Sequence, residues 1–277
     1  MISWEFNMKD ELKNKIIPIL KWAGGKRQLI PELINFIPRQ FNNYVEPFVG
    51  GGALYFYLAK KNSIINDSNL EIINLYKEIS KNPEAIVEGL KGYKNTEDFF
   101  YNLRKIIPKT KLGKAIRTIY LNRTCFNGLY RVNKKGEFNV PFGKYKNVNF
   151  VDENNLILAS KLLKKSKIYN KDYKYILKNH CKRGDLVFLD PPYIPISKYS
   201  DFKRYTKEQF QLNDQVELSE FYKTLDKKGC YLILTNSNHE IIKKLYNDFK
   251  IKIIKTKRNI NSKASKRTGE DIIITNF

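Results

Sequence analysis

The chain carries the tetrapeptide Asp-Pro-Pro-Tyr, at Asp190 to Tyr193, directly after the apolar run 186–189. The apolar run predicts a buried strand, and open α/β sheets bind their ligands at strand ends. An aromatic exocyclic amine is a poor nucleophile, and two fixed hydrogen-bond acceptors can orient it to accept a methyl group. Asp190 offers a carboxylate, and consecutive prolines can hold the Pro191 carbonyl as the second acceptor.

Tyr193 adds an aromatic ring that can stack on the face of a flat base. A proline-rich loop with Asp190 as an ordinary turn residue is the alternative interpretation. The position of all four residues at a strand end, downstream of a glycine loop, favours catalysis. We therefore predict a catalytic set that consists of Asp190, Pro191, Pro192 and Tyr193.

The glycine loop, in the stretch YVEPFVGGGALYF, lies between a predicted strand and a predicted helix. Gly50 and Gly52 would let a ligand approach the backbone closely, and the helix N-terminus favours negative charge. The dinucleotide pattern G-x-G-x-x-G is incomplete, because Tyr55 stands at its third glycine position. Asp67 follows the next strand and can accept hydrogen bonds from both ribose hydroxyls. The sequence thus favours a ligand that contains a nucleoside, with a tight turn and a surface acid as the alternative.

The elements that must position these groups alternate between strand and helix. We predict strands at 43–46, 63–66, 185–189 and 230–235, helices at 53–60, 70–80 and 154–164, and an amphipathic stretch at 209–225. Between about 83 and 145 the pattern changes to two helical stretches, 96–107 and 111–123, and a hairpin-like segment, 129–142. Two apolar runs near the C-terminus, 249–260 and 270–277, predict an antiparallel pair. The fold class is therefore α/β, with a mostly parallel sheet and an inserted helical and hairpin module.

Composition indicates the kind of partner. The chain has 277 residues and a formal net charge of +23, which predicts a polyanionic partner, with nucleic acid favoured over an anionic membrane surface. No run approaches the roughly 18 apolar residues of a membrane span, and the N-terminus has no signal-peptide pattern. Three scattered cysteines and two distant histidines show no metal-ligand spacing, so we expect a cytoplasmic protein without a metal.

Four segments occur in an order that resembles the Dam-type DNA adenine-N6 methyltransferases of the α arrangement. They are LKWAGGK at 20–26, EPFVGGGA at 46–53, NRTCFNGLYRVNKKGEFNVPFGKY at 122–145 and DPPY at 190–193. The resemblance implies a Rossmann-like seven-stranded methyltransferase sheet with an inserted DNA-recognition module. It places the catalytic domain at 1–75 and 155–277 and the target recognition module at 76–154. It also implies S-adenosylmethionine as the cofactor and double-stranded DNA as the substrate.

The resemblance assigns roles to the matching residues. The implied cofactor-binding residues are Trp22, Lys26, Glu46, Phe48, Gly50, Gly52, Asp67 and Asp190. Within this set, Trp22 would pack on the cofactor and Lys26 would meet its carboxylate. The implied DNA-binding residues are Phe126, Asn127, Leu129, Arg131, Asn133 and Pro141.

Asp190 can reach adenine N6 only after the base is flipped out of the duplex. The resemblance implies that Arg131 reads a guanine, that Leu129 and Pro141 touch base edges, and that Phe126 and Asn127 lie at the orphaned partner. It makes 5′-GATC-3′ the expected site, and the basic loop 261–269 is expected to contact phosphates or stay mobile. Without the resemblance, Phe126 and Leu129 would be read as module core, and Arg131 as a phosphate contact.

Other functions remain open from the sequence. The same acceptors would suit cytosine N4 or an RNA base, and an inactive basic DNA-binding protein could keep the fold. A nicotinamide-dependent oxidoreductase is disfavoured by the incomplete glycine pattern and by the charge. We expect a prokaryotic, nucleoid-associated enzyme with no membrane partner and no obligatory protein partner. A role beside a cognate restriction endonuclease system and a solitary role in regulation both remain open from the sequence.

Overall fold

The computed structural model describes residues 16–22, 26–133, 135–193, 210–257 and 268–277. Within them one seven-stranded sheet has the order β3-β2-β1-β4-β5-β7-β6. Its parallel strands are β1 (Tyr44–Glu46), β2 (Ile64–Asn66), β3 (Lys167–Tyr169), β4 (Leu186–Leu189) and β5 (Tyr231–Ser237). The antiparallel strands β6 (Lys250–Lys257) and β7 (Thr268–Thr275) complete it at the β5 edge. This mixed sheet is consistent with a Rossmann-like methyltransferase fold.

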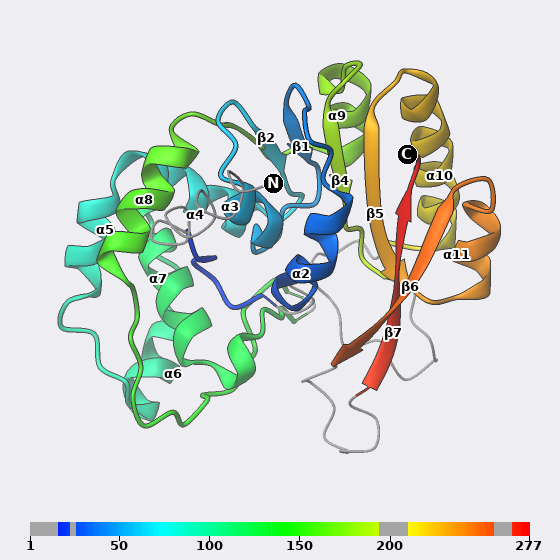
Figure 1. Cartoon of the computed structure of the whole chain (residues 1–277). Helices are drawn as coiled ribbons and strands as arrows, with labels where there is room; N and C mark the ends of the chain where they lie inside the picture. The colour runs from blue at the N-terminus through cyan, green and yellow to red at the C-terminus, as the bar shows by residue number, and fades with distance from the viewer. Residues whose placement is uncertain (1–15, 23–25, 134, 194–209, 258–267) are drawn as a thin grey trace, which may run out of the picture.

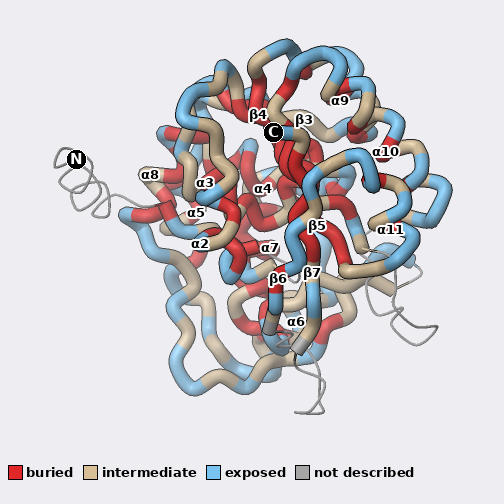
Figure 2. Tube along the Cα trace, turned by 45° about the vertical axis from the view of Figure 1, so that its right-hand side comes forward, coloured by how far each residue is buried: buried red, intermediate tan, exposed pale blue. Residues whose placement is uncertain are grey.

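The sheet is buried on both faces because its strands alternate between two hydrophobic clusters. In β4, Leu186 and Phe188 belong to one cluster, and Val187 and Leu189 belong to the other. This alternation follows from the two-residue period of a strand. Continuous apolar runs of this kind are typical of central parallel strands covered by helices on both faces. Figure 2 shows the buried segments in red running through β4 and β5 at the centre of the molecule.

One face of the sheet packs against three helices from the second half of the chain. They are α9 (Tyr173–His180), α10 (Leu212–Lys227) and α11 (Glu240–Leu245). The other face packs against α3 (Ala53–Leu58), α4 (Leu70–Lys81) and α8 (Glu153–Leu163). The segment before β1 adds the short helical turns η2 (Lys26–Leu29), α2 (Ile30–Leu33) and η3 (Ile34–Phe36).

The segment between α4 and α8 forms a helical group beside the sheet, on the left of Figure 1. It contains α5 (Pro83–Leu90), α6 (Glu97–Lys105), α7 (Lys111–Thr124) and the short turn η4 (Phe126–Gly128). Thr96 and Thr110 cap α6 and α7, since each side chain accepts a hydrogen bond from a backbone N–H of the first turn. Phe100 and Tyr120 lie in the same hydrophobic cluster as the α4 and β1 residues, so this group shares a continuous core with the sheet.

The structure confirms the predicted strands at β1, β2, β4 and β5, the helices at α3, α4, α6, α7 and α8, and the antiparallel pair β6–β7. The predicted amphipathic stretch forms the helix α10. The sequence pattern does not predict β3, α5, α9 or α11. The hairpin-like segment turns back on itself as expected, but through single bridges between Val132 and Phe138 and between Cys125 and Phe142 rather than a regular ladder. No helix among the described residues is long and apolar enough to cross a membrane.

Candidate active site

Three acidic residues lie at the carboxyl ends of neighbouring strands. Glu46 is the last residue of β1, Asp67 follows β2 and Asp190 follows β4. The strand order reverses between β1 and β4, because chain order runs outward from β1 to β3 on one side and from β4 onward on the other. Ligands of open α/β sheets bind at such a switch point. The fold therefore gathers the predicted acids at the edge where a ligand is expected.

Asp190 is held by a cation and a hydroxyl. The Lys26 Nζ atom lies 2.7 Å from Asp190 Oδ1, and Thr235 Oγ1 donates a 2.7 Å hydrogen bond to the same oxygen. Lys26 Nζ also lies 4.6 Å from the centre of the Tyr193 ring. Burial acts to lower the pKa of Lys26, but the nearby Asp190 and Tyr193 raise it above its ordinary value overall. Lys26 is thus a fixed positive charge beside the carboxylate.

The rest of the tetrapeptide is anchored from the other side of the sheet. The Pro192 carbonyl accepts a 2.9 Å hydrogen bond from Gln215 Nε2 on α10. Pro191 is buried and Pro192 is exposed, while Tyr193 is half-buried and burial raises the pKa of its hydroxyl. The structure therefore places Asp190, Lys26 and Tyr193 together, with the loop geometry fixed by α10.

The glycine loop and Asp67 form one hydrogen-bonded unit. Gly50 and Gly52 have φ angles of 46° and 66°, in the left-handed region that glycine adopts without strain. The Gly50 N–H donates a 2.8 Å hydrogen bond to Asp67 Oδ2, and the Asn69 N–H donates one of 2.8 Å to Asp67 Oδ1. Burial raises the pKa of Asp67 to about 6, although these two hydrogen bonds oppose the shift. Each carboxylate oxygen keeps a second lone pair, so Asp67 can still accept hydroxyl donors.

Glu46 lies deeper than the other two acids. Its side chain is buried, and the Tyr44 hydroxyl donates a 2.9 Å hydrogen bond to Oε2. Burial raises the pKa of Glu46 well above its usual range; the Tyr44 hydrogen bond opposes this, and the charges of Asp190 and Asp67 add to it. Burial therefore favours the protonated form of the Glu46 carboxyl.

Aromatic side chains flank the glycine loop. Trp22 packs on the loop so closely that a Cβ atom built on Gly51 would lie 2.7 Å from the Trp22 Cβ. The Trp22 ring also stacks on Tyr130, with a centroid distance of 5.2 Å. On the other side, the Phe48 ring lies 5.0 Å from that of Tyr173. The predicted Trp22 thus joins the glycine loop to the hairpin-like segment.

Asn122 on α7 holds the Trp22 segment in place. Its Oδ1 accepts a 2.8 Å hydrogen bond from the Lys21 N–H, and its Nδ2 donates to the Lys21 and Gly128 carbonyls at 2.7 and 3.0 Å. Asn122 lies in the segment that suggested the family, but no role was expected for it from the sequence. Its amide at a buried position of α7 is the signal that could have identified it.

Arg131 is tied across the hairpin-like segment. Its Nε donates a 2.8 Å hydrogen bond to Asn139 Oδ1, and its Nη2 donates a 3.2 Å bond to the Asn139 carbonyl. A guanidinium carries five N–H groups, so these bonds leave the outer edge of the fork able to bind a further acceptor. Asn133 has a local role, because its Oδ1 accepts hydrogen bonds from the Lys135 and Glu137 N–H groups within the turn.

The remaining predicted DNA-binding residues gather at the base of the segment. Phe126 is exposed, and its N–H donates a 2.9 Å hydrogen bond to the Pro141 carbonyl. Asn127 has a φ of 55°, and its N–H donates a 2.9 Å hydrogen bond to the Tyr145 hydroxyl. Leu129 is half-buried. Residues 261–267 of the predicted basic loop 261–269 lie outside the described residues.

No group of histidine, cysteine and acidic side chains in the described part of the chain could hold a metal ion. His239 caps α11, since its Nδ1 accepts a hydrogen bond from the Ile241 N–H, and His180 packs against Tyr169. Both histidines thus have local structural contacts in the described part of the chain.

Comparison with known proteins identifies relatives over almost the whole chain. The family model of D12 class N6 adenine-specific DNA methyltransferases matches residues 22–260. The chain is 40% identical to the Type II methyltransferase M1.LlaDCHI of Lactococcus lactis subsp. cremoris, over 98% of this chain and 99% of the relative. It is also 40% identical to the Type II methyltransferase M.MjaIII of Methanocaldococcus jannaschii, over 95% and 100% of the two chains. The DNA adenine methylase of Escherichia coli K12 is 30% identical, over 92% and 93%.

Proposed function

The chain belongs to the D12 class N6 adenine-specific DNA methyltransferases and methylates adenine N6 in DNA, and from this premise we propose its cofactor, its target site and its catalytic residues. The cofactor is S-adenosylmethionine, which supplies an electrophilic methyl group. The substrate is a flipped adenine in duplex DNA, within 5′-GATC-3′. The observation that carries this proposal is the cluster of acids at the ends of β1, β2 and β4, with Lys26 paired to Asp190.

The residues around the glycine loop suit this cofactor. The left-handed Gly50 and Gly52 keep side chains away from the backbone, as close approach of a ligand requires. Asp67 has free lone pairs for ribose hydroxyls, and Trp22 and Phe48 offer apolar surface on either side of the loop. Lys26 can bind a carboxylate, at the cost of sharing or loosening its contact with Asp190.

Asp190 and the Pro191 carbonyl act as the two acceptors for the target amine. The Pro192 carbonyl is already occupied by Gln215, which supports Pro191 rather than Pro192 as the second acceptor. Both acceptors stabilise the positive charge that grows on N6 as the new N–C bond forms. Tyr193 lies beside them and stacks on the flipped base.

The helical group and the hairpin-like segment, residues 76–154, form the target recognition module, and 1–75 with 155–277 form the catalytic domain. Exposed Phe126, next to Pro141, suits the gap that a flipped base leaves. Plasmid methylation with labelled cofactor tests the proposal as a whole. Methyl-sensitive endonucleases then show which adenine sites have become protected. Methylation at sites other than GATC would contradict the proposed recognition sequence. Methylation of bases other than adenine would contradict the proposed chemistry.

Arg131→Ala should collapse discrimination at the first base of the site. A bidentate contact to guanine O6 and N7 is worth about 1–3 kcal/mol, so GATC methylation should fall by that amount while sites altered at the guanine fall far less. The check is kcat/KM on GATC and on single-base variants. Asn139→Ala is the matched control, since it removes the side-chain bond to Arg131 Nε but keeps the guanidinium and its bond to the backbone carbonyl, and it should give an intermediate loss. Equal weakening on every site would instead identify Arg131 as a phosphate contact.

Cofactor binding should weaken as the pH falls through about 6. Burial raises the pKa of Asp67 to about 6, so the ionised acceptor is present above that pH and is lost below it. Affinity should therefore be full near pH 7.5 and lower near pH 5, measured by calorimetry at several pH values. Asp67→Asn should bind weakly at all of them. A variant that keeps the wild-type pH dependence would show that another group is responsible.

A cognate restriction endonuclease is the proposed biological partner. Two relatives that match the whole chain at 40% identity carry the name Type II methyltransferase, which supports this role over a solitary regulatory one. Co-expression with a GATC-cutting endonuclease tests the protection that this role requires, because the chain should then shield the host genome from cleavage.

A further inference from the structure

We propose that Thr235, Gln215 and Asn236 are positioning residues that hold the two amine acceptors of the Asp-Pro-Pro-Tyr loop in their reactive geometry. The inference rests on the proposed role of Asp190 and Pro191 as those acceptors. None of the three touches the reacting atoms directly; each acts through the loop. They lie on β5 and α10, outside the four segments that suggested the family.

Thr235 sets the orientation of the Asp190 carboxylate. The β4–β5 register pairs Leu189 with Leu234, so the next residue on each strand brings Asp190 beside Thr235. The Thr235 side chain is fully buried, and its hydroxyl donates 2.7 Å to Asp190 Oδ1. Lys26 Nζ meets the same oxygen at 2.7 Å. With Oδ1 held by both donors, Oδ2 is the oxygen assigned to the target amine.

Gln215 and Asn236 fix the peptide on the other side of the loop. Gln215 Nε2 donates 2.9 Å to the Pro192 carbonyl, and its Oε1 accepts 3.1 Å from Asn236 Nδ2. Asn236 Oδ1 in turn accepts 2.9 Å from the Ser237 N–H, which fixes the direction of both amides. Gln215 and Asn236 are fully buried, so each unmade bond would leave a polar group without water.

The strand β5 therefore supports the Asp-Pro-Pro-Tyr loop with side chains on both faces of the sheet. Thr235 and Asn236 are consecutive on β5, so their side chains point to opposite faces of the sheet. Thr235 fixes the carboxylate, and Asn236, through Gln215, fixes the Pro192 carbonyl. The Pro191 carbonyl, between these two anchors, is left to accept from the amine. Preorganised acceptors of this kind act on the transition state and leave binding of the ground state largely unchanged.

The test uses the full chain with Thr235→Val, which keeps the shape and removes the hydroxyl. We expect kcat to fall about 10- to 100-fold, the size of loss found when a residue that orients a metal ligand is removed, with the KM for DNA and the cofactor Kd within about twofold. Thr235→Ser should restore most of the rate. The matched control is Thr275→Val, another buried threonine on the neighbouring strand, whose hydroxyl bonds the Phe277 carbonyl, and it should keep the wild-type kcat.

Gln215→Met tests the second anchor without relying on Thr235. It removes both hydrogen bonds at similar side-chain length and should lower kcat about tenfold, with the double variant falling further. Wild-type kcat in folded Thr235→Val or Gln215→Met, or a loss that Thr235→Ser does not restore, overturns the inference. Asp190→Asn separates the two proposals. If it is inactive while Thr235→Val is normal, the positioning role alone fails; if it is fully active, the proposed role of Asp190 fails.

Discussion

Asp190→Ala should slow methyl transfer by about 10²–10³-fold while leaving DNA and cofactor binding only moderately weaker. Removing one preorganised polar partner of a transition state typically has an effect of this size. The structure adds a second reason, since the buried Lys26 ammonium would lose the carboxylate at 2.7 Å. Asp190→Asn keeps an oxygen for Lys26 and Thr235 but turns an amide N–H₂ toward the incoming amine. It should therefore fold better than the alanine variant and still be slow.

Single-turnover kinetics with preformed enzyme–DNA complex measure this effect on the chemical step alone. Glu220→Gln is the control for loss of one acidic side chain, because Glu220 lies exposed on α10 and pairs only with the surface Lys223 in the described structure. Thermal unfolding should be compared for all three variants. Near-wild-type turnover of folded Asp190→Asn would remove Asp190 from the catalytic set.

The sequence predicts the parts of the fold that have strong, continuous patterns. The run that became β4 is apolar and buried throughout, and β5 contains the buried apolar run 232–234, so their signal is clear. β1 and β2 are shorter, but each has two buried apolar or aromatic residues before a polar one. β3 is a three-residue edge strand whose side chains are half-buried or exposed, and no pattern of alternation distinguishes it. The helix α9 mixes polar and apolar residues over only eight positions, which is too short for a clear period.

The candidate site divides in the same way. Asp67, Glu46 and Asp190 follow directly from strand ends, which the sequence locates well. Their contacts do not follow, because these depend on the register between β4 and β5 and on where the turn η2 returns Lys26. Thr235 ends the predicted strand 230–235, Asn236 lies just beyond it, and Gln215 lies inside a predicted amphipathic stretch. Only the register and the α10 packing show that these three residues meet the loop.

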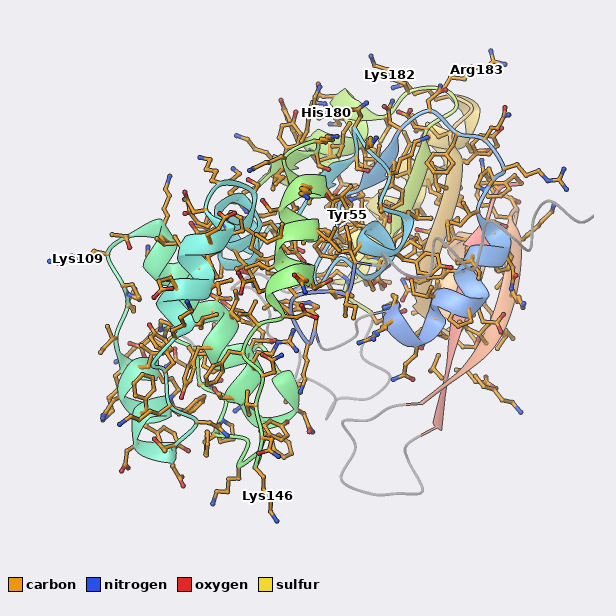
Figure 3. All side chains as sticks on the ribbon, turned by 60° about the vertical axis from the view of Figure 1, so that its left-hand side comes forward. Tyr55, Lys109, Lys146, His180, Lys182 and Arg183 are labelled. Atoms are coloured by element: carbon orange, nitrogen blue, oxygen red, sulfur yellow. The ribbon has the colours of Figure 1, made fainter. Side chains whose placement is uncertain are left out.

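Composition gives the net charge of +23 but does not show where on the surface the positive side chains lie. Part of it can reflect an AT-rich genome, which favours lysine codons, so the charge must be tested by position. Lys144 and Lys146 are exposed on either side of Tyr145, whose hydroxyl accepts the Asn127 N–H. They therefore flank the proposed base-contacting residues. Lys182 and Arg183 are also exposed, but they lie at the opposite end of the molecule from Lys146 (Figure 3).

Duplex binding should depend steeply on salt, and on one group of these cations only. If about six or more phosphates are contacted, affinity should fall by about 10³-fold or more between roughly 50 and 200 mM salt. Lys144→Gln with Lys146→Gln should reduce the slope of log affinity against log salt by about two units, since each lost phosphate contact accounts for about 0.9.

Lys182→Gln with Arg183→Gln, which removes the same charge from the far end, should leave that slope unchanged. Fluorescence anisotropy of a labelled GATC duplex at several salt concentrations measures both. Equal changes from the two pairs would mean that net charge, rather than a defined surface, attracts the DNA. A flat slope for the wild-type chain would mean that its excess of lysine makes no phosphate contacts at all. A smaller slope for the Lys144 and Lys146 pair alone would indicate that the duplex binds against the hairpin-like segment. There Asp190 and the proposed recognition module can reach the same adenine.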